Sequence, residues 1–166
     1  MNSKVIIGVT QNGKVVYIDS DSTHAHTHLS DTPELLRLVK EALGSIIAEG
    51  GSVYTEIDMG RIVGKTDLVE TRTGDDIVYA KRLNRNIHTR FVKNRTRANT
   101  SHVTIILHKT NDGYRLFSAW IGRKVPPFPG DEKETSESKT FWKRHALVWG
   151  QQVVQPNTEV YEWPWG

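Results

Sequence analysis

Two tight-turn sequences, each lying between runs of β-branched and aromatic residues, constrain the fold more than any other feature of the chain. The turn 111–113 (Asn-Asp-Gly) separates the runs 102–110 and 114–121, and Gln11-Asn12-Gly13 follows another such run. Asn-Gly and Asp-Gly favour the positive φ values of short hairpin turns, which lead the chain back into an antiparallel partner strand. The sequence therefore predicts two β-hairpins, one over residues 5–19 and one over residues 102–121.

A long helix is predicted after the first hairpin. Thr32, Pro33 and Glu34 favour the N-cap, the first position and the first turn of a helix. The apolar residues that follow recur at helical spacing; they are Leu35, Leu38, Val39, Ala42, Leu43, Ile46 and Ile47. Gly50 and Gly51 are expected to end this helix, since glycine is favoured just beyond a helix C-terminus.

The remaining segments predict mostly strands and a second, short helix. Further strands are expected at 52–57, 62–71, 87–92 and 146–149, and a short helix from 136 to about 145. The fold class is therefore α+β: an N-terminal hairpin and helix, followed by an antiparallel β-sheet with a short C-terminal helix. The chain has 166 residues and no linker-like segment, so a single domain over residues 1–166 is expected.

Several classes of protein are excluded or disfavoured by composition. Cysteine is absent, which excludes disulfide bonds, thiol catalysis and thiolate metal sites. The apolar stretch 5–9 is too short for a signal peptide, and no window approaches the ~20 apolar residues of a membrane-spanning helix. A cytoplasmic location without a membrane partner is expected.

The charges are unevenly distributed along the chain. Residues 77–111 contain no Asp or Glu and carry a charge of +8, whereas the net charge is +3, which leaves −5 for the remainder. The cations of this segment are Lys81, Arg82, Arg85, Arg90, Lys93, Arg95, Arg97 and Lys109. Such segregation creates a field that attracts anions. Contact with phosphate or nucleic acid is the favoured interpretation; an acidic protein partner and a solvated loop without a partner stay open.

His24, His26 and His28 form the most conspicuous motif for a metal. In a strand the three imidazoles would share one face and could bind zinc or nickel, which would suit a metal-dependent hydrolase. The segment is polar, however, and implies no fourth ligand, so a His-rich loop is favoured. We therefore predict no metal site and no cofactor, and expect any cleavage of nucleic acid to be metal-independent.

A metal-independent ribonuclease needs a base, an acid and a cation or donor that stabilises the phosphorane. His88 and Arg90 stand two residues apart in a predicted strand and would share one face. Ser118, near the end of another predicted strand, is expected to face them across the sheet and donate to a phosphate oxygen. His145 is the candidate for the second proton transfer. The residues expected to bind substrate are Arg82, Arg85, Lys93 and Trp120.

Aromatic residues gather in the last third of the chain and allow two interpretations. Trp120, Phe128, Trp142 and Trp149 could form a platform on which bases stack. They could equally cover the sheet as a small core, which is the favoured interpretation.

Part of the chain resembles a known family of ribonucleases. The segments 79–85 and 89–93, followed by the hairpin 102–122, resemble the C-terminal sheet of the barnase, EndoU, colicin and RelE group of ribonuclease folds, including its phage and polymorphic-toxin branches. Those proteins often end a strand with a hydroxyl residue, Ala, an aromatic residue and Pro, where this chain has Ser118-Ala119-Trp120-Ile121.

The resemblance covers roughly residues 66–123, and this chain has Ser in place of Thr, Trp in place of Tyr and Ile in place of Pro at that strand end. It implies a metal-independent endoribonuclease that acts on RNA from a sheet face, with a cognate inhibitor protein as a further partner. The alternative is a non-catalytic module of phage or bacterial origin that binds nucleic acid or protein.

Overall fold

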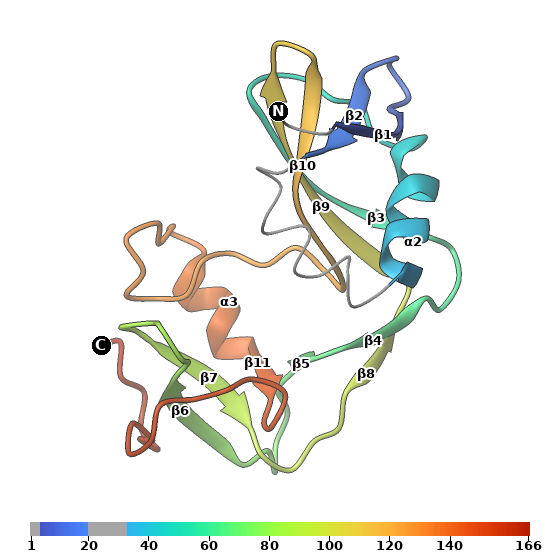
Figure 1. The fold of residues 1–166 in the computed structure, drawn as a ribbon. Coiled ribbons are helices and arrows are strands. Elements are labelled where there is room, and N and C mark those ends of the chain that lie inside the picture. Colours follow the sequence, from blue (N-terminus) through green and yellow to red (C-terminus); the bar gives the residue numbers. More distant parts are fainter. Residues whose placement is uncertain (1–3, 20–32) are drawn as a thin grey trace. The chain divides into compact units, whose positions relative to one another are not determined.

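The fold was described from a computed structural model, which describes residues 4–19 and 33–166. Contacts divide the chain into two compact units (Figure 1). Unit 1 takes in residues 1–64 and 100–124, and unit 2 takes in residues 65–99 and 125–166. The chain passes from one unit to the other three times, so neither unit is one continuous segment. The single domain expected over residues 1–166 stays a prediction.

Unit 1 is built on a five-stranded sheet with the order β1-β2-β10-β9-β3 (Figure 1). Its strands are β1 (Val5–Val9), β2 (Val15–Ile18), β3 (Ser52–Asp58), β9 (His102–Thr110) and β10 (Gly113–Ile121). Both predicted hairpins are confirmed, since β1 pairs antiparallel with β2 and β9 pairs antiparallel with β10. The pair β2–β10 is parallel, which joins the two hairpins into one sheet.

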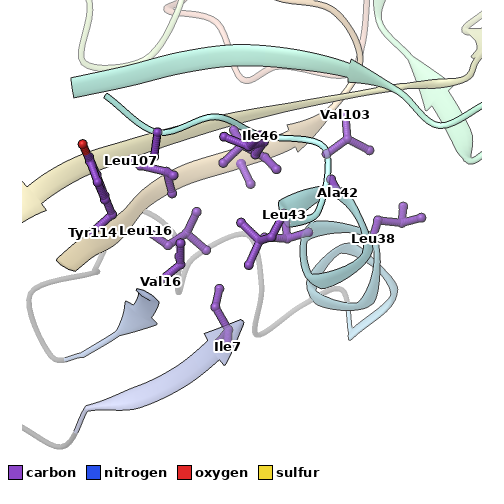
Figure 2. Close-up of a cluster of buried hydrophobic side chains, with 14 of the residues drawn as sticks. Ile7, Val16, Leu38, Ala42, Leu43, Ile46, Val103, Leu107, Tyr114 and Leu116 are labelled. Atoms are coloured by element: carbon purple, nitrogen blue, oxygen red, sulfur yellow. The ribbon is translucent and has the colours of Figure 1, made fainter. Parts of the chain in front are cut away.

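Helix α2 (Pro33–Leu43) packs its apolar stripe against this sheet. Figure 2 shows Leu38 and Leu43 of the helix gathered with Val103, Leu107 and Leu116 of the central strands. The sequence predicts that this helix continues toward Gly50. It ends at Leu43 instead, because residues 44 and 45 form a turn. Ile46 is nevertheless buried in the same core. Thr32, the expected N-cap, lies outside the described residues.

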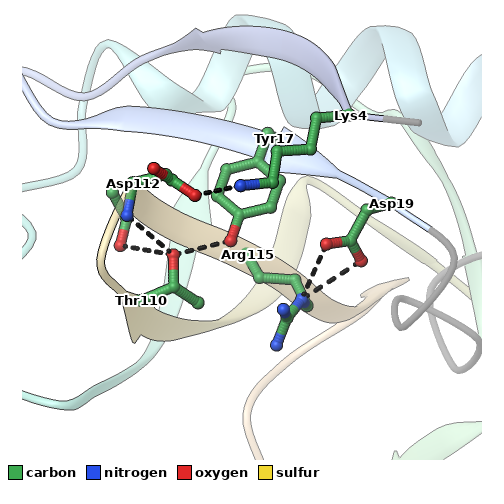
Figure 3. Close-up of polar contacts among 7 residues, drawn as sticks. Lys4, Tyr17, Asp19, Thr110, Asp112 and Arg115 are labelled. Atoms are coloured by element: carbon green, nitrogen blue, oxygen red, sulfur yellow. Dashed lines mark hydrogen bonds and ion pairs between the residues drawn. The ribbon is translucent and has the colours of Figure 1, made fainter. Parts of the chain in front are cut away.

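Polar contacts connect the N-terminal hairpin to the β9–β10 hairpin (Figure 3). Asp19 is buried and forms an ion pair of 3.2 Å with Arg115. The hydroxyl groups of Tyr17 and Thr110 share a hydrogen bond of 2.6 Å. Because a buried charge is costly without a partner, the Asp19–Arg115 pair helps to fix the parallel register of β2 and β10.

The turn between β9 and β10 requires glycine at position 113. Gly113 has a φ of 131°, and a Cβ there would lie 2.5 Å from the backbone oxygen of Val15. We expect Gly113→Ala to destabilise unit 1 by about 2–3 kcal/mol, through backbone strain and overpacking. Urea denaturation followed by circular dichroism measures this change. Gly44→Ala is the matched control, because a Cβ at Gly44 meets nothing within 4 Å; equal losses in the two variants would contradict this explanation.

Unit 2 contains a smaller, four-stranded sheet with the order β5-β11-β7-β6. Its elements are β5 (Leu68–Glu70), β6 (Ile77–Lys81), β7 (His88–Val92), α3 (Ser138–Arg144) and β11 (His145–Val148). β6 and β7 form an antiparallel hairpin, while β11 runs parallel to β7. One face of this sheet buries Val78, Ala80 and Phe91 against Leu147 and Trp149.

A third sheet consists of two short strands, β4 (Gly64–Thr66) and β8 (Ala98–Thr100). The described residues thus hold more strand than helix, which confirms the α+β class at that level. The prediction of one antiparallel sheet is wrong, because the strands divide among three sheets and two of the pairs are parallel. Within residues 4–19 and 33–166, no helix is both long and apolar enough to cross a membrane.

Candidate nucleic-acid interface

The β6–β7 hairpin of unit 2 positions most of the residues that the sequence singles out. Tyr79 lies opposite Arg90, and Lys81 lies opposite His88. Residues directly opposite each other in an antiparallel pair project from the same face of the sheet. Tyr79, Lys81, His88 and Arg90 therefore share one face, here named the basic face. The two-residue spacing of His88 and Arg90 predicts this shared face, and the register agrees with it.

Arg90 is held against the helix that follows in unit 2. Its Nη1 donates a hydrogen bond of 3.0 Å to the carbonyl oxygen of Trp142, in α3. Its guanidinium carbon lies 6.0 Å from the centre of the Tyr79 ring. The Nε atom of Arg90 is buried and has no hydrogen-bond partner among the described residues. The positive charge is thus positioned by the protein but is not neutralised by a described carboxylate.

Arg82 follows directly after β6 and packs on an aromatic stack. Its guanidinium carbon lies 5.1 Å from the centre of the Phe128 ring. Phe128 stacks in turn on Trp142, with ring centres 4.0 Å apart and planes inclined by 19°. Trp142 is fully buried and donates from its indole nitrogen to the carbonyl oxygen of Pro126. A rigid aromatic base therefore supports Arg82.

The environment of Arg82 disfavours its charge. Burial lowers the pKa of the Arg82 guanidinium, and the charge of Arg85 lowers it further, while Asp131 acts in the opposite direction. An arginine stays protonated despite such a shift. The Nε of Arg82 is also buried without a partner among the described residues. Arg82 is thus a partly desolvated cation beside a second one.

The C-terminal segment adds two indole rings next to the basic face. Val160 and Tyr79 exchange backbone hydrogen bonds of 2.8 Å, which hold this segment along the edge of β6 (Figure 1). Trp163 and Trp165 both meet the Tyr79 ring edge to face, with centres 6.1 and 5.2 Å from it. Lys143 of α3 lies 5.7 Å from the centre of the Trp163 ring. Cations and aromatic rings therefore alternate around Tyr79.

Three cations of the acid-free segment are neutralised by acids from elsewhere in unit 2. Lys93 pairs with Glu159 at 3.6 Å, Arg95 with Asp75 at 3.1 Å and Arg97 with Asp67 at 2.8 Å. For four others in the same unit, no described carboxylate lies within ion-pair distance; they are Lys81, Arg82, Arg85 and Arg90. Among the cations that the acid-free segment contributes to unit 2, those without a described carboxylate partner thus gather where β6 ends and β7 begins. Lys109 belongs to unit 1.

Two predicted site residues belong to unit 1. Ser118 and Trp120 lie in β10, opposite Ile106 and Thr104 of β9. Since β7 pairs with β6 and β11, Ser118 and His88 lie in different sheets. The prediction that Ser118 faces His88 and Arg90 across one sheet is therefore wrong.

His145 lies in unit 2 but on another face of the sheet. Leu147 and Val148 of β11 stand beside Phe91 and Val92 of β7. Side chains alternate between faces along a strand, so His145 shares the face of Leu147 and Phe91, and Arg90 projects from the opposite one. The His145 ring stacks on Phe141 at 4.0 Å. Within unit 2 the β6–β7 hairpin thus groups His88, Arg90 and the Arg82–Arg85 region, whereas His145 projects from the other face of the sheet.

Lys93, expected to bind substrate, does not belong to the basic face; its ammonium group lies over aromatic rings. Its Nζ lies 4.9 Å from the centre of the Trp149 ring and 5.9 Å from that of Tyr161. Trp149 also meets Phe91 edge to face at 5.2 Å. Phe128 and Trp142 are buried against each other and Trp149 packs on Phe91, while Trp120 lies in unit 1 beside Tyr54, so the four aromatic residues do not form the one small core that was favoured.

Sequence reasoning missed several contributors to this region. Tyr79, Gln155, Trp163 and Trp165 were not among the candidates, although the aromatic C-terminal segment was a signal that could have indicated the last two. His24, His26 and His28 lie outside the described residues. Of the described side chains, no group of three or more His, Asp or Glu is placed so as to hold a metal ion.

Comparisons of the chain with protein-family models, with curated proteins and with solved structures found no match. The resemblance to ribonuclease folds therefore stays an expectation from the sequence.

Proposed function

We propose that the chain binds RNA through the basic face of unit 2 and the adjoining Arg82–Arg85 turn. The observation that carries this proposal is the group of four cations at one end of the β6–β7 hairpin, for which no described carboxylate lies within ion-pair distance. Lys93, Arg95 and Arg97, which follow along the same segment, each pair with an acid of unit 2, so they do not add to this group. Phosphate groups are suitable counter-ions for such a cluster.

Aromatic rings beside these cations favour a single-stranded ligand. The half-buried Trp163 and Trp165 pack on the buried Tyr79 beside Arg90, and single-stranded nucleic acids are bound by combining backbone cations with aromatic stacking. The preference for RNA over DNA rests on the resemblance to ribonuclease folds.

Neutralising the turn is expected to weaken RNA binding and its salt dependence. In Arg82→Gln/Arg85→Gln, affinity should fall about tenfold or more, because each lost phosphate contact removes a charge-assisted hydrogen bond. The slope of log affinity against log salt should decrease by about 1.4, or ~0.7 per contact. Fluorescence anisotropy with a labelled single-stranded RNA at several salt concentrations measures both.

The matched control is Arg37→Gln/Arg61→Gln, two exposed arginines of unit 1 that pair with Glu34 and Glu41. This variant should bind as the parent does. An unchanged salt slope in the Arg82/Arg85 variant would reject the proposed interface. Binding of an acidic protein but not of RNA would support the interaction-module alternative instead.

Metal-independent cleavage of RNA is the second candidate function. It is favoured by His88, Arg90 and Lys81 projecting from one face, since His88 could act as the base or the acid and the two cations could stabilise the phosphorane. Incubation with total RNA in EDTA, followed by analysis of the product ends, tests it. Binding is better supported than cleavage, because His145, the candidate for the second proton transfer, projects from the other face of this sheet.

A further inference from the structure

The turn that carries Arg82 and Arg85 is fixed by the C-terminal segment of unit 2. The side-chain Nε2 of Gln155 donates to the carbonyl oxygens of Arg82 and Arg85, at 3.1 and 2.7 Å. The backbone N–H of Arg85 donates to the carbonyl of Arg82 at 3.1 Å, and that of Leu83 donates to Val153 at 2.9 Å. Two arginines are thus presented by one turn whose backbone is already ordered.

This turn carries a charge that the described chain leaves uncompensated. Arg82 lies on the Phe128 ring with its Nε buried and without a described partner. Arg85 is close enough for its charge to disfavour that of Arg82. The charge of Asp131 favours that of Arg82, but the two side chains form no ion pair. A desolvated cation beside a like charge is unfavourable, and the attraction of a bound anion to both guanidinium groups would offset these two penalties.

The geometry points to the Arg82–Arg85 turn as a site for a phosphate monoester at the end of an RNA chain. This inference rests on the proposed RNA binding. A terminal monoester carries a charge of about −1.5 to −2 at neutral pH, which matches two guanidinium groups. An internal phosphodiester carries one negative charge and would leave one of the two arginines uncompensated. Guanidinium groups also match phosphate oxygens with paired hydrogen bonds, which lysine cannot provide.

The test compares RNA oligonucleotides of one sequence that differ only at their ends. Fluorescence anisotropy is measured for a 5′-phosphorylated form labelled at its 3′ end and for a 3′-phosphorylated form labelled at its 5′ end. Each is compared with a hydroxyl-ended form that carries the label at the same end. One phosphorylated form is expected to bind about tenfold tighter than the hydroxyl-ended form, a gain typical of charge-assisted hydrogen bonds. The arm that shows the gain identifies which end the turn binds.

Arg82→Gln, Arg85→Gln and Arg82→Lys are expected to abolish this end preference, whereas Arg37→Gln should keep it. Gln155→Ala should reduce the preference with an intact melting transition, since Gln155 acts on the turn and not on the ligand.

Two results separate this inference from the proposed function. Equal affinity for the phosphorylated and hydroxyl-ended oligonucleotides, with a normal salt slope, would overturn the end site and leave RNA binding in place. If no oligonucleotide binds, the proposed function fails, and titration with a nucleoside monophosphate decides the site alone. Loss of monophosphate binding in Arg82→Gln supports the inference, and absence of binding to the parent chain overturns it.

Discussion

Replacement of Trp142 by alanine is expected to destabilise unit 2 by about 3–5 kcal/mol, the usual loss for a large buried aromatic side chain. Trp142 is fully buried, stacks on Phe128 at 4.0 Å and meets Phe141 edge to face at 5.0 Å. Its indole nitrogen also donates to Pro126. Removing the ring leaves a cavity beneath Arg82 and a backbone carbonyl without its donor.

Equilibrium denaturation, followed by tryptophan fluorescence and circular dichroism, measures this loss. Tyr161→Ala is the control within unit 2, because Tyr161 is 62% exposed and a surface substitution changes stability by about 0.5 kcal/mol or less. A loss below about 1 kcal/mol in Trp142→Ala would be too small for a buried tryptophan and would contradict the packing of α3. RNA binding should fall together with stability, since Phe128 and Arg90 both depend on Trp142.

If the chain cleaves RNA, His88→Gln is expected to lower the rate of cleavage by about 10² or more, as loss of a general acid or base does. His88 lies on the basic face opposite Lys81 and two residues from Arg90. Histidine is the side chain that most often acts as a general acid or base. Arg90→Lys should have a similar effect, because it loses the planar guanidinium.

The rates are measured under single-turnover conditions in EDTA, with melting curves for each variant. His108→Gln serves as the control, since His108 lies in β9 of unit 1, stacked on Phe117. A parent chain that leaves RNA uncut in EDTA removes the catalytic proposal and leaves the binding proposal standing. Full cleavage by both His88→Gln and Arg90→Lys would place the chemistry elsewhere.

Local sequence signals predicted the two hairpins correctly. They did not predict the features that depend on contacts between residues far apart in the sequence. The turn 111–113 joins two strands by its own backbone preference, and both strands were expected within a residue of where they lie. Helix α2 was predicted too long, because Ile46 fits the helical spacing of apolar residues. The helix ends at Leu43, and Ile46 is buried in the core from a position just after the turn that follows it. The parallel pairing of β2 with β10 depends on segments about a hundred residues apart, for which periodicity gives no signal.

The same distinction holds for the candidate site. His88 and Arg90 share a face because strand periodicity is local, so their spacing was sufficient to predict it. The position of Ser118 depends on which strands pair, and β10 pairs with β9 and β2 instead of β7. Sequence composition alone could not show that Arg95 is neutralised by Asp75, which lies just before the acid-free segment.

The Asp75–Arg95 contact illustrates why a linear charge count overestimates the basic surface. The Asp75 side chain is only 4% exposed. Burial by itself would raise the pKa of the Asp75 carboxyl group. Hydrogen bonds from the Arg72 backbone and from the Arg95 side chain outweigh this effect, so the pKa is lowered. A cation that holds a buried carboxylate is not free to bind phosphate. The footprint of eight cations expected from the sequence therefore reduces to four in unit 2.

Because the chain crosses between the two units three times, the units receive their last residues at different times during synthesis. Unit 1 has all of its residues once residue 124 has left the ribosome, whereas unit 2 still lacks β11, α3 and the segment that fixes the Arg82–Arg85 turn. Domains generally form as soon as their residues are available. Residues 65–99 would then wait as a loop closed by the folded unit 1, with β6 and β7 paired but the edge of β7 uncovered. The loop is tethered at both ends, which lowers the entropy lost when β11 arrives to pair with β7.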